Sequence, residues 1–205
     1  MRTSVLMVAA AAAIGVMSVE VVPMTIDPTV SAAHAQGPVD AAPTSSDPLI
    51  ELLLQRLNTA DAVVAAKWVG SHGQHPMIDD PERERVVYDS MSRAGAALGL
   101  PESWVRQVFA GQIEANKMVQ RGLLARWRLD PASAPRTSPD LTAVRPIIDR
   151  VNGQILQQLA QRRAELRGPN CAERLSAGVF GVFTSGGSDA LHQTALVRAA
   201  AAICG

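Results

Sequence analysis

Several signatures by which enzymes are commonly recognised are missing from this sequence. It contains no HExxH, GxSxG or Walker A motif, and no glycine-rich dinucleotide fingerprint. These absences argue against the usual zinc peptidase, serine hydrolase and nucleotide-binding designs. Beyond residue 35 the only histidines are His72, His75 and His192, and no other His or Cys lies at ligand spacing from the first two. We therefore predict no metal site and no cofactor.

An excess of charge of one sign is also missing, and aromatic side chains are scarce. Nineteen basic and nineteen acidic residues give a formal net charge of zero, and no basic run occurs. Neither nucleic acid nor an anionic membrane surface is therefore an expected partner. Aromatic residues make up 3% of the chain, and no apolar alternation with a period of two persists, which disfavours strands. Abundant Ala, Leu, Arg and Gln favour helices, so we predict an all-α fold.

The first 35 residues differ in character from the rest of the chain. Arg2 precedes an apolar run over residues 5–22 that only small residues and Glu20 interrupt, and residues 33–35 read Ala-His-Ala. This pattern is typical of a secretory signal peptide cleaved after Ala35. A retained membrane anchor is the alternative, because the run is close to spanning length. Cleavage would release the protein into the periplasm or the medium, with no membrane segment left.

A short leader and one helical domain follow. Residues 36–46 predict a flexible leader, and residues 47–205 are long enough for one domain with a core. Asp-Pro pairs at 47–48 and 80–81 predict helix starts. We expect a bundle of about six helices: three long core helices over 47–68, 80–98 and 101–127, a fourth over 141–166 after the proline-rich segment 130–139, and a C-terminal hairpin of helices over 171–177 and 189–204.

Two details of this layout are open to test. Pro146 fits the first turn of the fourth helix if Thr142 caps that helix. Cys171 and Cys204 are the only cysteines, and an even count in an exported chain favours a disulfide. Such a bond would close a loop of about 33 residues and hold the C-terminal hairpin. Two free buried thiols are the alternative.

The first predicted helix carries two cations on one side. Arg56 and Lys67 are eleven residues apart, about three helical turns, so they project in nearly the same direction. Their neighbours are mostly apolar. Surface cations with their stems laid along the helix are the ordinary interpretation. The alternative interpretation is that the two cations form a line of positive charge that faces a groove.

The next two helices carry polar sets of their own. Asp80, Arg83 and Glu84 lie at i, i+3 and i+4, where surface ion pairing is the ordinary interpretation. Asn116 and Gln120 lie at i and i+4 on the third helix, where amides are usually solvated. Each set alone is weak evidence, but the ordered series along three successive helices is more specific.

That ordered series resembles the all-helical chorismate mutases, in particular their long secreted form. The resemblance covers about residues 47–204 and rests on the segments LLQRLNTADAVVAAKW, DDPERERVV, WVRQVFAGQIEANKMVQ, RWRLDPASAP and PDLTAVRPIIDRVN. It implies that the chain isomerises chorismate to prephenate by a pericyclic rearrangement, without a covalent intermediate. Such a reaction needs no nucleophile, metal or general base, so the missing motifs agree with it. Orientation and electrostatic preorganisation would supply the catalysis.

The resemblance gives three residues expected catalytic roles. Arg56 is expected to bind a substrate carboxylate, because a planar guanidinium suits bidentate binding. Lys67 and Gln120 are expected to donate hydrogen bonds to the ether oxygen of the breaking bond, where negative charge develops.

It also implies five further substrate-binding positions. Asp80 and Arg83 would line the site, and Glu84 would accept a hydrogen bond from the ring hydroxyl. Asn116 stands where the family often has a small hydroxyl residue, so its role is open. Arg145 would supply, from the same chain, an arginine that short intracellular members take from a partner chain.

The expected partner is thus the small molecule chorismate, and a homodimer is a weaker expectation. The alternative function is an exported helical binding module without catalysis. An exposed apolar groove would favour that module, whereas polar side chains converging on one small cavity would favour the enzyme.

Overall fold

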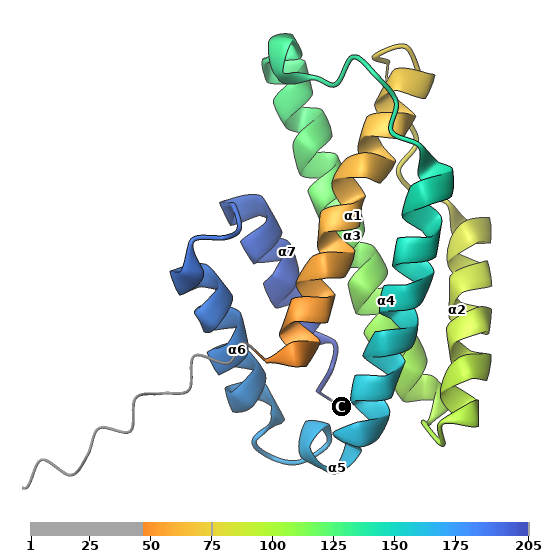
Figure 1. Cartoon of the computed structure of the whole chain (residues 1–205), viewed down its shortest axis with the longest axis vertical. Helices are drawn as coiled ribbons and strands as arrows, with labels where there is room; N and C mark the ends of the chain where they lie inside the picture. The colour runs from red at the N-terminus through yellow and green to blue at the C-terminus, as the bar shows by residue number, and fades with distance from the viewer. Residues whose placement is uncertain (1–46, 75, 205) are drawn as a thin grey trace, which may run out of the picture. The chain divides into compact units, whose positions relative to one another are not determined.

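The computed structural model describes residues 47–74 and 76–204, and all the regular structure within them is helical (Figure 1). The predictions of a signal peptide at 1–35 and a leader at 36–46 lie outside the described residues. The all-α prediction, with three long core helices and a C-terminal hairpin, is confirmed. The elements are α1 (Pro48–Gly70), α2 (Pro81–Ala97), α3 (Glu102–Leu129), the 3-10 turn η1 (Pro131–Ser133), α4 (Leu141–Gln161), α5 (Arg163–Leu166), α6 (Cys171–Ser185) and α7 (Ala190–Ala201).

Aspartate side chains cap four of these helices, and each accepts from N–H groups that have no partner within the helix. The caps are Asp47, Asp80, Asp140 and Asp189. The two Asp-Pro predictions are therefore confirmed, but the condition set for Pro146, a cap at Thr142, is not met. The Asp140 carboxylate caps α4 instead and accepts from both the backbone N–H and the hydroxyl of Thr142, at 2.8 and 2.7 Å. Pro146 consequently lies beyond the first turn of the helix.

The structure differs from the prediction just before α4 and near the end of α4. The proline-rich segment 130–139 lies outside the predicted helices, yet Pro131–Ser133 forms one 3-10 turn. Proline is tolerated there because the first position of a helix needs no N–H donor. The expected helix over 141–166 is interrupted at Arg162 and resumes as α5.

The C-terminal hairpin also differs in its boundaries. The first of its helices does not end near residue 177, because α6 continues to Ser185 and stops at Gly186, which has a φ of 69°. Leu175, Val179 and Val182 are buried along α6, and this tertiary packing outweighs the low helix propensity of its glycines. The connection between α6 and α7 is therefore shorter than the predicted boundaries implied, and α7 ends at Ala201 rather than at residue 204.

Helix α1 lies in the middle of the bundle and packs against α3, α4 and α7 (Figure 1). The apolar face of α1 is fully buried at Leu49, Ile50, Leu53, Leu57 and Val64. Burying a large aliphatic side chain contributes about 1.5–3 kcal/mol, so this one helix anchors much of the core. No helix of the described residues is both long and apolar enough to cross a membrane.

Two glycines let α3 approach α7 closely. A Cβ atom at Gly111 would overlap the Cβ of Ala202, and one at Gly122 would lie 2.6 Å from a methyl carbon of Leu191. The structure shows that their missing side chains make room for the last helix.

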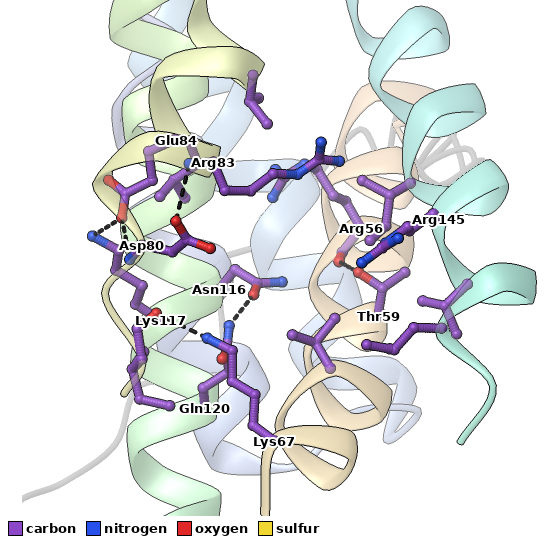
Figure 2. Close-up of a pocket in the computed structure, with 17 residues that line it drawn as sticks. Arg56, Thr59, Lys67, Asp80, Arg83, Glu84, Asn116, Lys117, Gln120 and Arg145 are labelled. Atoms are coloured by element: carbon purple, nitrogen blue, oxygen red, sulfur yellow. Dashed lines mark hydrogen bonds and ion pairs between the residues drawn. The ribbon is translucent and has the colours of Figure 1, made fainter. Parts of the chain in front are cut away.

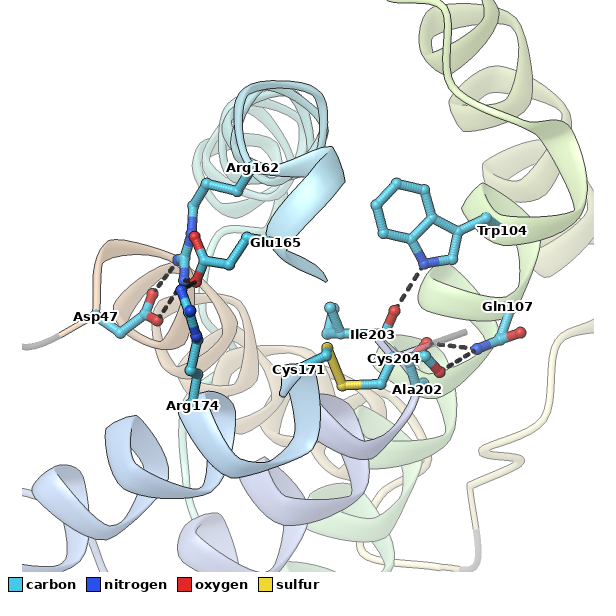
Figure 3. The surroundings of a disulfide bond; sticks show 10 residues. All are labelled: Asp47, Trp104, Gln107, Arg162, Glu165, Cys171, Arg174, Ala202, Ile203 and Cys204. Atoms are coloured by element: carbon cyan, nitrogen blue, oxygen red, sulfur yellow. Dashed lines mark hydrogen bonds and ion pairs between the residues drawn. A yellow bond between two sulfur atoms is a disulfide. The ribbon is translucent and has the colours of Figure 1, made fainter. Parts of the chain in front are cut away.

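The predicted disulfide joins Cys171, the first residue of α6, to Cys204, which follows α7 (Figure 3). Hydrogen bonds fix the same C-terminal segment to α3. The indole N–H of Trp104 donates to the carbonyl of Ile203 at 2.7 Å, and the Gln107 amide donates to the carbonyl of Cys204 at 3.1 Å. The hairpin is therefore tied to the bundle both covalently and through α3.

We expect the Cys171→Ala/Cys204→Ala double variant to lose about 3–4 kcal/mol of unfolding free energy, because the bond constrains a loop of this length in the unfolded chain. Urea unfolding of the oxidised wild type and the double variant would measure the difference. Reduced wild type should match the double variant. Equal unfolding midpoints for all three forms would contradict the expectation.

A buried histidine connects α7 to α1. Nδ1 of His192 lies 2.9 Å from a carboxylate oxygen of Asp189, and its Nε2 lies 3.0 Å from one of Asp61. Only the imidazolium form carries an N–H on both nitrogens, so two carboxylate partners favour the protonated state. The hydrogen bond to Asp61 is the main cause that raises the pKa of His192; burial opposes it, and Asp189 adds to it.

This arrangement makes stability dependent on pH. The pKa of His192 is higher in the folded protein than in the unfolded chain, where it is about 6.5. Its contribution is therefore fully present below about pH 6.5 and is lost as pH rises through the raised pKa. We expect the unfolding free energy of the wild type to fall, as pH rises above about 6.5, more steeply than that of His192→Gln. Parallel urea-derived curves for the two proteins would contradict this.

Candidate active site

A cavity of about 270 Å³ lies among α1, α2, α3 and α4 (Figure 2). All eight polar residues proposed from the sequence line it, although their roles stay predictions. Apolar side chains of the same four helices and of the segment before α2 complete the walls. The eight are Arg56, Lys67, Asp80, Arg83, Glu84, Asn116, Gln120 and Arg145.

Arg56 lies on the buried side of α1, and its side chain is not a surface cation. Only 5% of the residue is exposed. Its Nε donates to Oδ1 of Asn152 at 2.7 Å, and its Nη1 donates to the carbonyl of Gln112 at 3.1 Å. Burial lowers the pKa of Arg56 to about 10, so the guanidinium is still charged near neutral pH. The interpretation of Arg56 as a surface cation is therefore wrong.

Lys67 reaches the same cavity three turns further along α1. Its ammonium donates to the carbonyl of Ile78 at 3.0 Å, and the residue is half-buried. Burial lowers the pKa of Lys67, while the carboxylates of Asp80, Asp79 and Glu84 oppose that shift. One ammonium hydrogen is donated to the carbonyl of Ile78, so the other two are left for a ligand.

The beginning of α2 supplies two carboxylates and one arginine. Asp80 caps the helix by accepting from the backbone N–H of Arg83 at 3.0 Å. The backbone N–H of Asp80 points back to Glu84, at 3.4 Å from its Oε1. The cap thus fixes the direction in which α2 starts, and this places Arg83 and Glu84 at the cavity.

A lysine that the sequence analysis did not propose holds Glu84. The Nζ of Lys117, on α3, lies 2.7 Å from Glu84, 2.9 Å from Glu114 and 3.0 Å from Asp79. Burial alone would lower the pKa of Lys117, but the hydrogen bonds to Glu84, Glu114 and Asp79 together outweigh it and raise that pKa. The Lys117 ammonium therefore holds its charge beside the Glu84 side chain, 2.7 Å away.

The two amides of α3 contact each other one helical turn apart. Nε2 of Gln120 donates to Oδ1 of Asn116 at 2.6 Å (Figure 2). A primary amide nitrogen carries two hydrogens, so Gln120 keeps one donor for a ligand. Asn116, whose role was open, orients Gln120 through this contact.

Arginines enter the cavity from opposite walls, Arg83 from α2 and Arg145 from α4 (Figure 2). Neither side chain has a hydrogen bond or ion pair with another residue in the part of the chain that the structure describes. Both guanidinium groups are thus available to an anion. Thr59, a lining residue that the sequence analysis missed, lies one turn after Arg56 and donates its hydroxyl to the Arg56 carbonyl at 2.7 Å.

Sequence signals for the two missed residues were weak. Thr59 is at i+3 from Arg56 and so shares its face of α1. Lys117 follows Asn116 directly, and Glu114 at i−3 is a local ion-pair partner for it. Nothing in the local sequence shows that Asp79 and Glu84 also surround it. Within the described residues, no group of three or more His, Cys, Asp or Glu side chains is placed to hold a metal ion, and His75 lies outside them.

Comparison with known proteins connects this cavity to a family. Residues 46–121 match the family model for chorismate mutase type II. Over 165 residues the chain is 34% identical to the secreted chorismate mutase of Mycolicibacterium smegmatis, covering 80% of this chain and 88% of that one. It is 32% identical over 156 residues to the secreted chorismate mutase of Mycobacterium tuberculosis, covering 76% of each. The chain belongs to the secreted chorismate mutase family.

The fold agrees with a solved chorismate mutase. The structure of the enzyme from Burkholderia phymatum superposes with a TM-score of 0.70 and 34% identity, over 77% of this chain and 94% of that one. The match to the type II family model ends at Arg121, within α3. Arg145, which lies on α4, is therefore outside the residues that match the family model.

Proposed function

We propose that the cavity among α1 to α4 is where this chorismate mutase isomerises chorismate to prephenate, within residues 47–205. The observation that carries the proposal is the convergence of Arg56, Arg83, Arg145 and Lys67 on one cavity of a size suited to a small molecule. Substrate and product are dianions. Positive side chains without internal carboxylate partners would bind such a ligand and hold it in the compact shape that the rearrangement requires.

The arginines are assigned to the two carboxylates of the substrate. A guanidinium presents paired N–H donors that match a carboxylate, and burial strengthens such contacts. Arg56 lies in the dry floor of the cavity, whereas Arg83 and Arg145 lie on exposed parts of its walls. We assign Arg56 to one carboxylate of the substrate. We assign the two exposed arginines, Arg83 and Arg145, to the other carboxylate.

Lys67 and Gln120 are assigned to the ether oxygen. Negative charge develops on this oxygen as its bond to carbon breaks, so donors fixed in advance stabilise the transition state more than the substrate. Lys67 is oriented by the carbonyl of Ile78, and Gln120 by Asn116. Each retains a free hydrogen for the oxygen.

Glu84 is assigned to the ring hydroxyl as an acceptor. The ion pair with Lys117, at 2.7 Å, fixes the position of the Glu84 side chain. The carboxylate takes no proton in the reaction, because the rearrangement moves no proton. Asp80 supports the site through its cap rather than through the chemistry.

We propose further that the protein works after export. Cleavage after Ala35 would remove the signal peptide and leave residues 36–46 as a leader, as the sequence predicts. All walls of the cavity come from one chain, so the proposed site does not need a second subunit. Pairing into a homodimer stays a weaker expectation.

The alternative of a binding module is less well supported. An apolar groove does lie along α6 and α7, and Phe180 beside it is 65% exposed. That groove is separate from the residues lining the polar cavity. Family membership and the converging cations both favour the enzyme.

The direct test is the loss of chorismate absorbance with purified residues 36–205. Acid conversion of the product to phenylpyruvate would identify prephenate. Turnover that obeys saturation kinetics supports the proposal. No turnover at micromolar enzyme, with a cooperative thermal unfolding transition that shows the protein is folded, would overturn it.

A further inference from the structure

Arg56 is buried without an acidic partner. No carboxylate of the described residues forms an ion pair with it, and both of its hydrogen-bond acceptors are neutral oxygens. Burying a charge is costly unless it is paired. The folded protein therefore maintains an uncompensated cation at the floor of the cavity, held only by an amide oxygen and a backbone carbonyl.

The amide oxygen belongs to Asn152 on α4. This residue is 1% exposed and does not line the cavity, so it would not touch a ligand. Its Oδ1 lies 2.7 Å from Nε of Arg56, the shorter of the two contacts that fix the guanidinium. Asn152 is 96 residues away from Arg56 in sequence. It ends the segment PDLTAVRPIIDRVN, but the sequence analysis gave it no role.

We propose that Asn152 is a positioning residue that orients Arg56 through a neutral acceptor and so reserves the positive charge for a substrate carboxylate. The proposal rests on the function proposed above. A guanidinium has five N–H donors, and Asn152 and Gln112 use one each. The three that are left can bind a carboxylate, which then becomes the missing counter-ion.

Asn152 accepts the hydrogen bond from Arg56 without adding a negative charge. An aspartate has nearly the same shape and could accept the same hydrogen bond, but it would also pair with the Arg56 charge. Such a pair would relieve the cost of the buried cation and stabilise the fold. It would at the same time weaken the attraction between Arg56 and a substrate carboxylate. Stability and substrate affinity should therefore change in opposite directions.

The variants Asn152→Asp and Asn152→Leu test this inference, with Gln154→Glu as the matched control. Gln154 is exposed on the same helix, so that control adds the same charge away from Arg56. For Asn152→Asp we expect KM for chorismate to rise about tenfold to a hundredfold, with a much smaller change in kcat and a Tm higher by about 2–4 °C. Asn152→Leu removes the acceptor without adding charge, so KM should rise while Tm falls. Gln154→Glu should match the wild type.

The outcomes separate this inference from the proposed function. A wild type that does not turn over chorismate overturns both. A wild type that is active, beside an Asn152→Asp variant with unchanged KM, overturns only the inference. A raised KM together with a lowered Tm in Asn152→Asp would show a purely structural role and would also overturn it. A raised KM with a raised Tm supports it.

Discussion

Replacing Lys67 by methionine is expected to lower kcat by about 10²–10³-fold while the fold stays intact, because one preorganised donor to a developing oxyanion is worth that much. Methionine keeps most of the length of the lysine stem and removes only the ammonium. Lys67 is half-buried and donates to one backbone carbonyl, that of Ile78. Little of the folding free energy depends on that contact, so the loss should fall on the reaction.

The measurement is kcat at saturating chorismate, with Tm recorded for each protein. Arg93→Met is a suitable control, because Arg93 is exposed on α2 and does not line the cavity. It removes one positive charge and should leave kcat at the wild-type value. A near-normal kcat for Lys67→Met would remove the lysine from the mechanism.

The second large effect is expected from Gln120→Glu, which should make activity depend on pH. Gln120 is 5% exposed, and one hydrogen of its amide is used by Asn116. A glutamate can donate to the ether oxygen only when it is protonated. Above the pKa of the new carboxyl, kcat should fall by at least about 10²-fold, because a donor is lost and a negative charge faces the developing one. Below that pKa, activity should return.

The profile of log kcat against pH checks this expectation. The wild type should be nearly flat, because a neutral amide donates at any ordinary pH, whereas Gln120→Glu should rise as pH falls. Gln120→Leu serves as the control: it should be slow and flat, since it has no donor at any pH. If Gln120→Glu stays as active as the wild type near pH 7.5, Gln120 does not face the ether oxygen.

Local chemistry was enough to predict where most helices begin, whereas the residues that line the cavity were predicted from the resemblance to the chorismate mutases. Asp47 and Asp80 precede prolines, and each carboxylate caps its helix as expected. Arg56 and Lys67 were linked through helical spacing, but spacing could not tell a surface stripe from a cavity wall. Only the ordered set on the next two helices favoured the cavity.

What the sequence did not reveal depends on contacts between distant segments. Lys117 is held by carboxylates that come from three places in the chain, including Asp79 in the loop before α2. Asn152 meets Arg56 across the core. The end of α6 was misplaced because its glycines disfavour helix locally, and only burial against the bundle outweighs that preference. In each case, the deciding energy comes from tertiary packing rather than from neighbouring residues.

The origin of the cavity's four helical walls in one chain has a consequence for an exported protein that becomes diluted. A site shared between subunits exists only while the protein concentration exceeds the dissociation constant of the dimer. Here Arg145 reaches the cavity from α4 of the same polypeptide as Arg56. Dilution therefore leaves the cavity intact, and the turnover rate per enzyme molecule should not depend on the protein concentration.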